Sequence, residues 1–205
     1  MIDQSIMRGG IMARARSSKK REDIFQAGLK LFSQHGYSKT TIKDVAEEAG
    51  VSFGTVFTYF ETKDQLFHAC VTEPLVEFRE HIMEIRNRLE TLTLQQLKQI
   101  IDQHVDMFFE KEREIRVIQY VIGQPERFQE MEELDSFANE FTQFIQDIVV
   151  IGMKKGFLPN SNPEEVGHGY LAFLMGARLT YTDHKNVQLT NGFKNQALRL
   201  FGIGV

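Results

Sequence analysis

The residues of this chain whose types and spacing suit chemistry at close range lie between positions 41 and 63. They combine hydroxyl groups, aromatic rings, a glycine and two lysines: Thr41, Lys43, Ser52, Phe53, Gly54, Thr55, Phe57, Thr58, Tyr59 and Lys63. Hydroxyls can bond base edges or phosphates, a phenyl ring can touch the methyl group of thymine, and glycine lets a backbone approach closely. Lysines beside helix N-termini can hold phosphates. We therefore expect this segment to contact double-stranded DNA.

Elsewhere the chain offers no set of residues suited to catalysis or metal binding. The histidines at positions 81, 104, 168 and 184 lie far apart, and none pairs with another at i+3 or i+4, the spacing that metal sites on helices often use. No glycine-rich phosphate loop or nucleophile elbow is present. Cys70 falls on the apolar side of an expected helix, which favours a small buried hydrophobe over a redox sensor. We predict a protein that is not an enzyme and that binds no metal or cofactor.

Three helical patterns position the segment that we expect to contact DNA. A first helix over about residues 20–35 carries its apolar side chains on one stripe and stops at Gly36, because glycine tolerates the left-handed turn that follows a helix. Thr41 can cap a second helix of about two turns, and Asp44 three residues later completes a capping box.

A tight turn over residues 50–52 joins the second helix to the third. Gly50 supplies a positive φ, and Ser52 can cap the third helix, which runs to Phe60. Val56 and Phe60 form the buried side of this helix, so its other residues remain available for the major groove. The pattern is typical of a helix-turn-helix, and its alternative interpretation is a helical hairpin that only packs.

Capping signals divide the rest of the chain into further helices. Helix starts are marked by Thr62 with Gln65, Thr93 with Gln96, and Asn162 with Pro163. Pro74 is expected to bend the long fourth helix, and a shorter helix is expected over residues 113–122. Two lysines and a glycine at 154–156 suit a helix C-terminus. With no alternating strand pattern, the sequence predicts an all-α fold of about nine helices.

Charge is distributed unevenly along the 205 residues. Residues 1–65 hold 10 Lys and Arg against 8 Asp and Glu, although the net charge of the whole chain is -4. Five of the basic residues fall within 14–21, and we expect residues 1–18 to be a flexible basic arm that contacts phosphates or reaches the minor groove. With one cysteine, no signal-peptide pattern and no apolar run near the roughly 20 residues that span a bilayer, we expect a cytoplasmic protein with no membrane partner.

The stretch TTIKDVAEEAGVSFGTVFTYFETKDQLF, residues 40–67, resembles the helix-turn-helix of the TetR family of transcriptional regulators. The matching positions are Gly36-Tyr37, Ala46, Ala49, Gly50-Val51-Ser52, Gly54-Thr55-Val56, Phe60 and Lys63. Two positions depart from the family pattern. Phe57 lacks the hydroxyl of the tyrosine that is more usual there, and Phe53 stands where a polar or basic residue is common. The resemblance implies a DNA-binding domain over residues 19–66 and a ligand-binding and dimerisation domain over residues 67–205.

The resemblance also implies two partners for the helical body. One is a small apolar or amphipathic effector, for which we expect a cavity lined by Phe78, Ile82, His104, Phe108, Gln119, Tyr120, Phe141, Phe144 and Met175, unless these residues are plain core. The other is a second copy of the chain, bound through the last two long helices, which makes the operator a near palindrome with recognition helices about 34 Å apart or somewhat more. The function expected is thus a dimeric repressor that its effector releases from DNA. The alternative is a DNA-bound adaptor whose body binds a protein partner and no effector.

Overall fold

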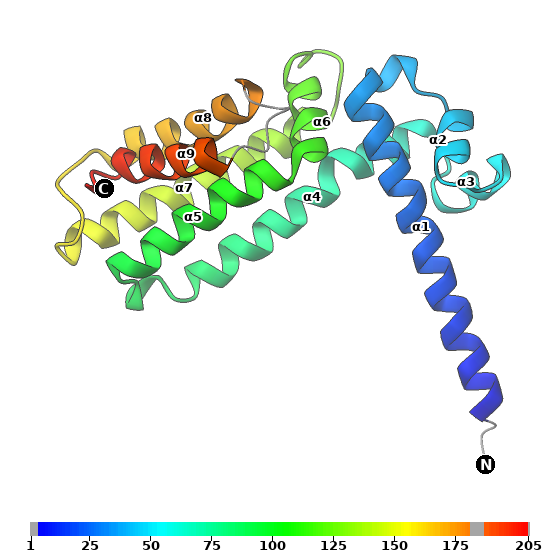
Figure 1. Cartoon of the computed structure of the whole chain (residues 1–205), viewed down its shortest axis with the longest axis horizontal. Helices are drawn as coiled ribbons and strands as arrows, with labels where there is room; N and C mark the ends of the chain where they lie inside the picture. Colours follow the sequence, from blue (N-terminus) through cyan, green and yellow to red (C-terminus); the bar gives the residue numbers. More distant parts are fainter. Residues whose placement is uncertain (1–3, 181–186, 205) are drawn as a thin grey trace. The chain divides into compact units, whose positions relative to one another are not determined.

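A computed structural model describes residues 4–180 and 187–204 of the chain, which divide into two compact units, residues 1–71 and 72–205. The described residues form nine α-helices and one short 3-10 helix and contain no strand (Figure 1), which confirms the predicted all-α class. The helices are α1 (Gln4–Lys39), α2 (Ile42–Glu48), α3 (Phe53–Tyr59), α4 (Lys63–Arg86), η1 (Leu89–Thr91), α5 (Leu94–Glu110), α6 (Glu112–Ile122), α7 (Met131–Lys154), α8 (Pro163–Thr180) and α9 (Val187–Leu200).

The first helix is longer than the sequence predicted. It begins at Gln4 instead of near Lys20, so residues 4–18, expected as a flexible arm, continue the helix. No proline interrupts this segment, and its arginines, methionines and alanines are good helix formers. At the other end Gly36 takes a φ of 72° and a ψ of 171°, and this break in the helical backbone occurs where the glycine signal indicated. The side chains before Ser17 lie outside the described part of the chain.

Aromatic and aliphatic side chains hold the first unit together. The ring of Phe67 on α4 lies edge to face with Phe32 and with Tyr37, each with ring centroids 5.0 Å apart. Gly28 lets α1 and α4 approach closely, because a Cβ atom at this position would lie 3.0 Å from the Cδ2 atom of Leu66. These contacts fix α1 against the start of α4 and form the support on which α2 and α3 rest.

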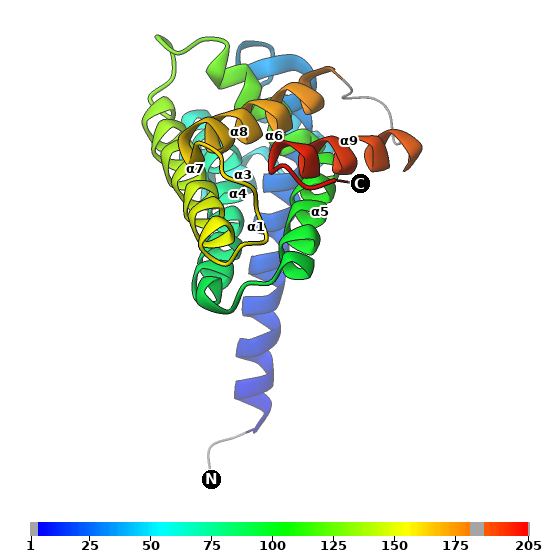
Figure 2. The same cartoon turned by 90° about the vertical axis from the view of Figure 1, so that its left-hand side faces the viewer.

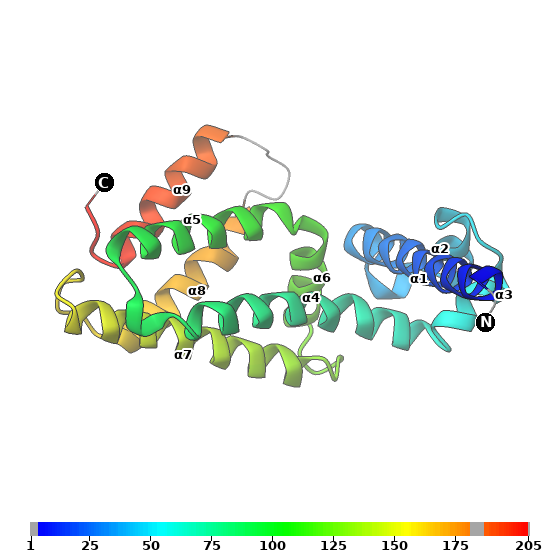
Figure 3. The ribbon, with the colours of Figure 1, turned by 90° about the horizontal axis from the view of Figure 1, so that it is seen from below.

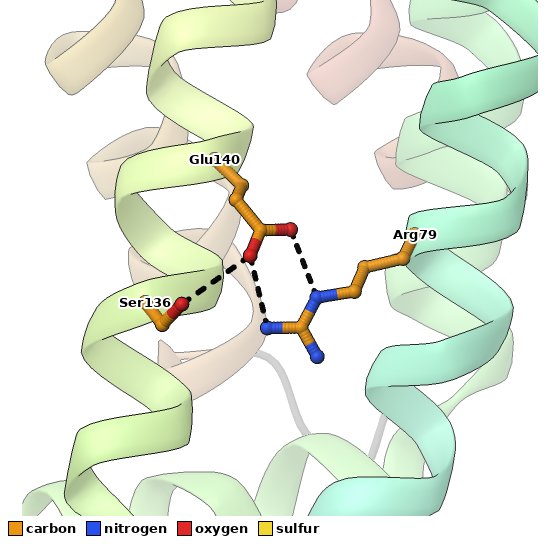
Figure 4. A network of polar contacts seen from close by, with 3 residues as sticks. All are labelled: Arg79, Ser136 and Glu140. Carbon is orange, nitrogen blue, oxygen red and sulfur yellow. Dashed lines mark hydrogen bonds and ion pairs between the residues drawn. The ribbon is translucent and has the colours of Figure 1, made fainter.

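The second unit is built from long helices that pack in pairs. α7 and α8 run alongside each other (Figure 2), and α9 packs against α5 (Figure 3). An ion pair joins α4 to α7: the guanidinium of Arg79 donates two hydrogen bonds to the carboxylate of Glu140, at 2.8 and 3.2 Å, and Ser136 donates a third (Figure 4). The hydrogen bonds from Arg79 lower the pKa of the Glu140 carboxyl.

Helix ends follow the signals in the sequence. Thr93 and Gln96 form the predicted capping box at the start of α5, and Asn162 accepts a hydrogen bond from the backbone N–H of Glu164 at the start of α8. At the start of α4 the expected box is altered: Gln65 donates its N–H to Thr62, but its side chain accepts from Glu61 instead. Each arrangement satisfies backbone donors that a helix start leaves without an intrahelical partner.

An aromatic cluster occupies the core of the second unit. We use this name for His104 and the rings that contact it directly, those of His81, Phe141, Phe144 and Tyr170, whose centroids lie 5.4 to 6.2 Å from the imidazole centroid. His104, Phe141, Phe144 and Tyr170 are buried, and His81 is half-buried. Four helices, α4, α5, α7 and α8, meet at this cluster.

Candidate nucleic-acid interface

The predicted turn between α2 and α3 is formed as the sequence indicated. The hydroxyl of Thr41 accepts the N–H of Asp44, and the Asp44 carboxylate accepts the N–H of Thr41 at 2.9 Å, so the capping box is complete. The hydrogen bonds from Thr41 lower the pKa of the Asp44 carboxyl. Gly50 in the turn has a φ of 65°, a conformation that favours glycine. α2 therefore begins at a defined residue and ends in a fixed turn.

The third helix has one buried side and one exposed side. Ser52 caps it by accepting the N–H of Thr55. Val56 is 0 % exposed and Phe60 is 2 % exposed, which confirms that these two residues form the back of the helix. Because α3 has only seven residues, its position depends on this buried side and its cap more than on its own helical stability.

Two phenylalanine rings dominate the exposed side of α3. Phe53 is 55 % exposed and Phe57 is 38 % exposed, and their rings meet edge to face with centroids 5.0 Å apart. We call these two residues the aromatic pair. Between them, Gly54 has open space where a side chain would stand, so a ligand can approach its backbone.

Several hydroxyl groups near the aromatic pair already have partners within the protein. The Ser52 and Thr55 hydroxyl oxygens lie 2.7 Å apart, and Thr58 donates its hydroxyl proton to the carbonyl of Gly54. The Tyr59 hydroxyl lies 3.2 Å from the hydroxyl of Ser17 on α1. The sequence did not indicate the contact with Ser17, because the two residues are far apart in the chain.

The helices before and after α3 each carry a basic side chain. Lys43 is exposed in the first turn of α2. Lys63, at the start of α4, places its ammonium group 4.0 Å from the ring centroid of Tyr37, and the Tyr37 hydroxyl donates to Asp64. Tyr37 is thus a positioning residue for a predicted phosphate contact, and its role follows from tertiary packing that the helix-turn-helix pattern does not encode.

Most of the ten predicted DNA contacts are accessible to a ligand. Seven are exposed: Thr41, Lys43, Ser52, Phe53, Gly54, Phe57 and Thr58. Three are half-buried: Thr55, Tyr59 and Lys63. All ten come from α2, α3, the residues that cap these two helices, and the first residue of α4. They combine two apolar rings, several hydroxyl groups and two cations.

The nine residues predicted to line an effector cavity lie in the second unit. Six are buried: Phe78, Ile82, His104, Phe108, Phe141 and Phe144. Three are half-buried: Gln119, Tyr120 and Met175. The amide of Gln119 donates to the carbonyl of Met175 at 3.4 Å, and Tyr120 packs on Phe128. Several of the nine thus pack on one another or on neighbouring rings.

A pocket of about 310 Å³ lies between α4 and α5, apart from those nine residues. It is lined by His81, Glu84, Ile85, Arg88, Leu92, Gln96, Gln99, Ile100 and Gln103. Sequence reasoning did not find it, because its polar residues resemble an ordinary solvated face on each helix. His81 belongs both to this pocket and to the aromatic cluster, and it contacts His104 across the two helices.

Burial sets the protonation of the aromatic cluster. Burial first and the nearby His81 second lower the pKa of His104 to about 3. The Nδ1 atom of His104 lies 3.3 Å from the Tyr170 hydroxyl, whereas its Nε2 atom has no hydrogen-bond partner among the described residues. Burial raises the pKa of that hydroxyl. His104 is therefore neutral at physiological pH.

The described residues offer neither a metal site nor a membrane-spanning helix. Across residues 4–180 and 187–204, no three side chains of His, Cys, Asp or Glu gather as a metal site would require. In the same residues no helix combines the length and apolar character needed to cross a membrane. Cys70 is buried, as the sequence predicted.

The fold and the exposed helix together define a helix-turn-helix protein with a helical body. Residues 24–70 match the family described as "Bacterial regulatory proteins, tetR family". A probable acrEF/envCD operon repressor of Escherichia coli (strain K12) is 40 % identical over 55 residues, which are 27 % of this chain and 25 % of that protein. The chain thus matches about a quarter of the length of this relative.

Solved structures resemble nearly the whole chain. A TetR transcription regulator from Haloarcula marismortui is 20 % identical with a TM-score of 0.69, over 90 % of this chain and 97 % of that one. NalD of Pseudomonas aeruginosa, the secondary repressor of the MexAB-OprM multidrug efflux pump, is also 20 % identical, with a TM-score of 0.67 over 92 % and 96 % of the two chains. Residues 24–70 thus match the helix-turn-helix segment of the tetR family, as the sequence pattern indicated, and the solved structures share the fold of the chain.

Proposed function

We propose that this protein is a sequence-specific DNA-binding transcriptional regulator. The observation that carries the proposal is α3, which has a buried back at Val56 and Phe60 and an accessible front, with Lys43 on the helix before it and Lys63 on the helix after it. This is the form that a recognition helix needs to enter the major groove while the protein holds phosphates on either side. Residues 19–66 would bind DNA, and residues 67–205 would bind an effector and a second copy. A protein that acts on the bacterial chromosome would be cytoplasmic.

The proposal includes a homodimer formed through α8 and α9. The exposed residues of α8 include a stripe of small and apolar residues, Gly169, Ala172, Gly176 and Leu179. Small residues let two helices approach closely, and Leu179, 65 % exposed, would gain from burial against a partner. Two-fold symmetry would then present two α3 helices to a palindromic operator.

The dimer has a direct test. Ala172→Glu places a charge within the stripe and is expected to yield a monomer that binds operator weakly, because each half-site alone supplies half of the contacts. Gln143→Glu, on an exposed position of α7, adds the same charge elsewhere and serves as the control. Light scattering that gives the same dimer mass for Ala172→Glu and for the unchanged protein would contradict an α8 interface.

The proposal also includes release of DNA by a small apolar or amphipathic effector. The aromatic cluster supports it, since the Nε2 atom of His104 is a buried polar group without a partner beside apolar rings. A coupling of about 1 to 3 kcal/mol between the two sites would change DNA affinity about 5- to 150-fold. Thermal-shift screening of small molecules tests this, and a ligand that stabilises the protein but not a His104→Leu variant would identify the site.

Selection of genomic fragments by the purified protein tests the function as a whole. We expect the bound fragments to share a palindromic sequence and binding to weaken steeply with salt, because phosphate contacts release counterions. Fragments without a shared sequence, together with a shallow salt dependence, would contradict a specific regulator. Sequence-specific binding that no small molecule releases, with a protein retained on the DNA-bound body, would favour the adaptor instead.

A further inference from the structure

The centre of the exposed face of α3 is apolar. The aromatic pair, Phe53 and Phe57, lies one helical turn apart on the same side, and the two rings are in contact at a centroid distance of 5.0 Å. Two exposed rings in contact present a continuous patch from which water is favourably released on binding. The chemistry of this patch decides which groups of a DNA groove it can recognise.

The polar groups around the aromatic pair are poorly placed to compete with it. Thr58 has its hydroxyl proton on the carbonyl of Gly54, and Ser52 and Thr55 bond each other at the start of the helix. The side chains of α3 include no cation and no amide, the groups that make bidentate hydrogen bonds to guanine or adenine. What remains on the outward side is chiefly the apolar surface of the two rings.

We propose that Phe53 and Phe57 recognise thymine through its C5-methyl group. The inference rests on the proposed DNA-binding function and gives it a chemical specificity. In the major groove thymine is distinguished by this methyl group, which cytosine lacks. DNA is the occupant because residues 24–70 match a DNA-binding helix-turn-helix, and Lys43 and Lys63, on the helices before and after α3, can neutralise phosphates. The ring separation of 5.0 Å lies between one and two base-pair steps of about 3.4 Å, so the two thymines are adjacent or next but one.

The proposal has a consequence for modified DNA. 5-Methylcytosine carries a methyl group at the same position of the ring as thymine. A contact that depends on the methyl group alone accepts 5-methylcytosine where it rejects cytosine. Methylation of cytosine at these positions therefore strengthens binding, whereas a reader that uses hydrogen bonds to the exocyclic amine gains nothing from it.

The experiment replaces single thymines of a selected operator by uracil, which removes the methyl group and keeps every hydrogen-bonding atom. Removing a methyl that the rings bury is expected to weaken binding about fourfold at the contacted positions and to have no effect elsewhere. Cytosine at the same positions is expected to weaken binding, and 5-methylcytosine to restore part of the loss. Affinity is measured by fluorescence anisotropy at one fixed salt concentration.

Variants of the aromatic pair assign the effect to these residues. Phe53→Asn and Phe57→Asn remove one ring each. Each variant is expected to bind with equal affinity two operators that carry thymine or uracil at the position which the missing ring contacted. Val76→Asn, which replaces another exposed apolar residue on α4, keeps the full preference for thymine and serves as the control. Melting temperatures check that each variant is folded, which its exposure leads us to expect.

The outcomes separate the proposal from the function on which it rests. A shared operator whose affinity is unchanged by uracil at every position would overturn the methyl contact and leave the regulator intact. A preference for thymine that persists in Phe53→Asn and Phe57→Asn would overturn the assignment to these residues. If no shared operator is found, the proposed function fails. Equal affinity for (dA)·(dT) and (dA)·(dU) duplexes would then refute the methyl contact as well.

Discussion

Aromatic rings have opposite surroundings in the core of the second unit and on α3 of the first unit. In the second unit Phe141, Phe144 and Tyr170 lie buried around His104, where each ring is covered by the others. In the first unit the aromatic pair stands in solvent, on a helix of seven residues. Buried rings stabilise a fold through the area they remove from water, while exposed rings contribute little to folding and are kept for a partner. The same residue type therefore forms the core in the second unit, as it also does at Phe32 and Phe67 in the first, and a proposed recognition surface on α3.

The largest expected difference in the free energy of unfolding is between two variants that each lose one ring, one variant in each unit. Phe144→Ala should lower the free energy of unfolding by about 3 to 5 kcal/mol, because it removes buried area and leaves a cavity. Phe53→Ala should change it by less than about 0.5 kcal/mol, because the ring is exposed. Chemical denaturation at a fixed protein concentration measures both. Comparable losses in the two variants would mean that the aromatic pair also supports the fold, and the contrast between the units would be lost.

The second prediction uses the buried histidine of the cluster. The pKa of His104 is lowered to about 3 in the folded state, so its contribution to stability is present above the unfolded pKa near 6.5 and is lost as the pH falls below it. Between pH 7.5 and pH 5 the unfolded chain takes up a proton that folded His104 does not accept. The free energy of unfolding should fall by about 2 kcal/mol from this group.

A His104→Leu variant supplies the control for that pH dependence. It should lose stability near neutral pH because Tyr170 loses its partner, yet its pH dependence over the same interval should be shallower by about 2 kcal/mol. Parallel curves for the two proteins would show that His104 is protonated in the fold. The exposed aromatic pair, with no titratable neighbour of this kind, should leave the pH dependence unchanged when it is replaced by alanine.

The third prediction compares two capping boxes of the same design. Thr41→Ala and Thr93→Ala should each lower the free energy of unfolding by about 1 kcal/mol, because each leaves a backbone donor without its acceptor. α2 has seven residues and α5 has 17, so the local consequences differ. Hydrogen exchange should become faster throughout α2 but only in the first turn of α5. If hydrogen exchange became faster over an equal part of both helices, this would show that α2 does not depend on its cap.

The smallest expected effect concerns the ion pair that joins α4 to α7. Glu140→Gln should lower the free energy of unfolding by about 0.5 kcal/mol, since both side chains are partly exposed and solvent screens the pair. The loss should shrink at high salt and at a pH low enough to protonate Glu140, whose pKa is lowered by Arg79. Ser136→Ala, which leaves both charges in place, is the matched variant. A loss well above 1 kcal/mol would place this pair among the main supports of the second unit.

Local features of the fold could be predicted from the sequence because their causes lie within a few residues. The caps at Thr41, Ser52 and Thr93 and the break at Gly36 each depend on one side chain and its near neighbours. The predicted start of α1 was wrong, because a cluster of basic residues is as typical of a solvated arm as of a helix. Composition alone does not separate these two states.

Tertiary contacts could not be predicted in the same way. His81 and His104 show no metal-like spacing along the chain, yet their rings lie 5.4 Å apart because α4 and α5 pack together. The side chain of Arg178 is only 2 % exposed, and its Nη2 atom lies 3.3 Å from a carboxylate oxygen of Glu112. Nothing in the sequence around either residue indicates this ion pair. The buried back of α3 was predictable from periodicity, whereas the contact between Tyr59 and Ser17 was not.

The boundary between the two units falls inside a helix instead of in a loop. α4 runs from Lys63 to Arg86 through the boundary between Val71 and Thr72. A protease needs extended, accessible backbone, so limited digestion should cut elsewhere in the chain first. The same feature restricts how such genes can be recombined. A chimaera that joins this helix-turn-helix to another body must therefore exchange all of α4 or keep its helical register across the junction.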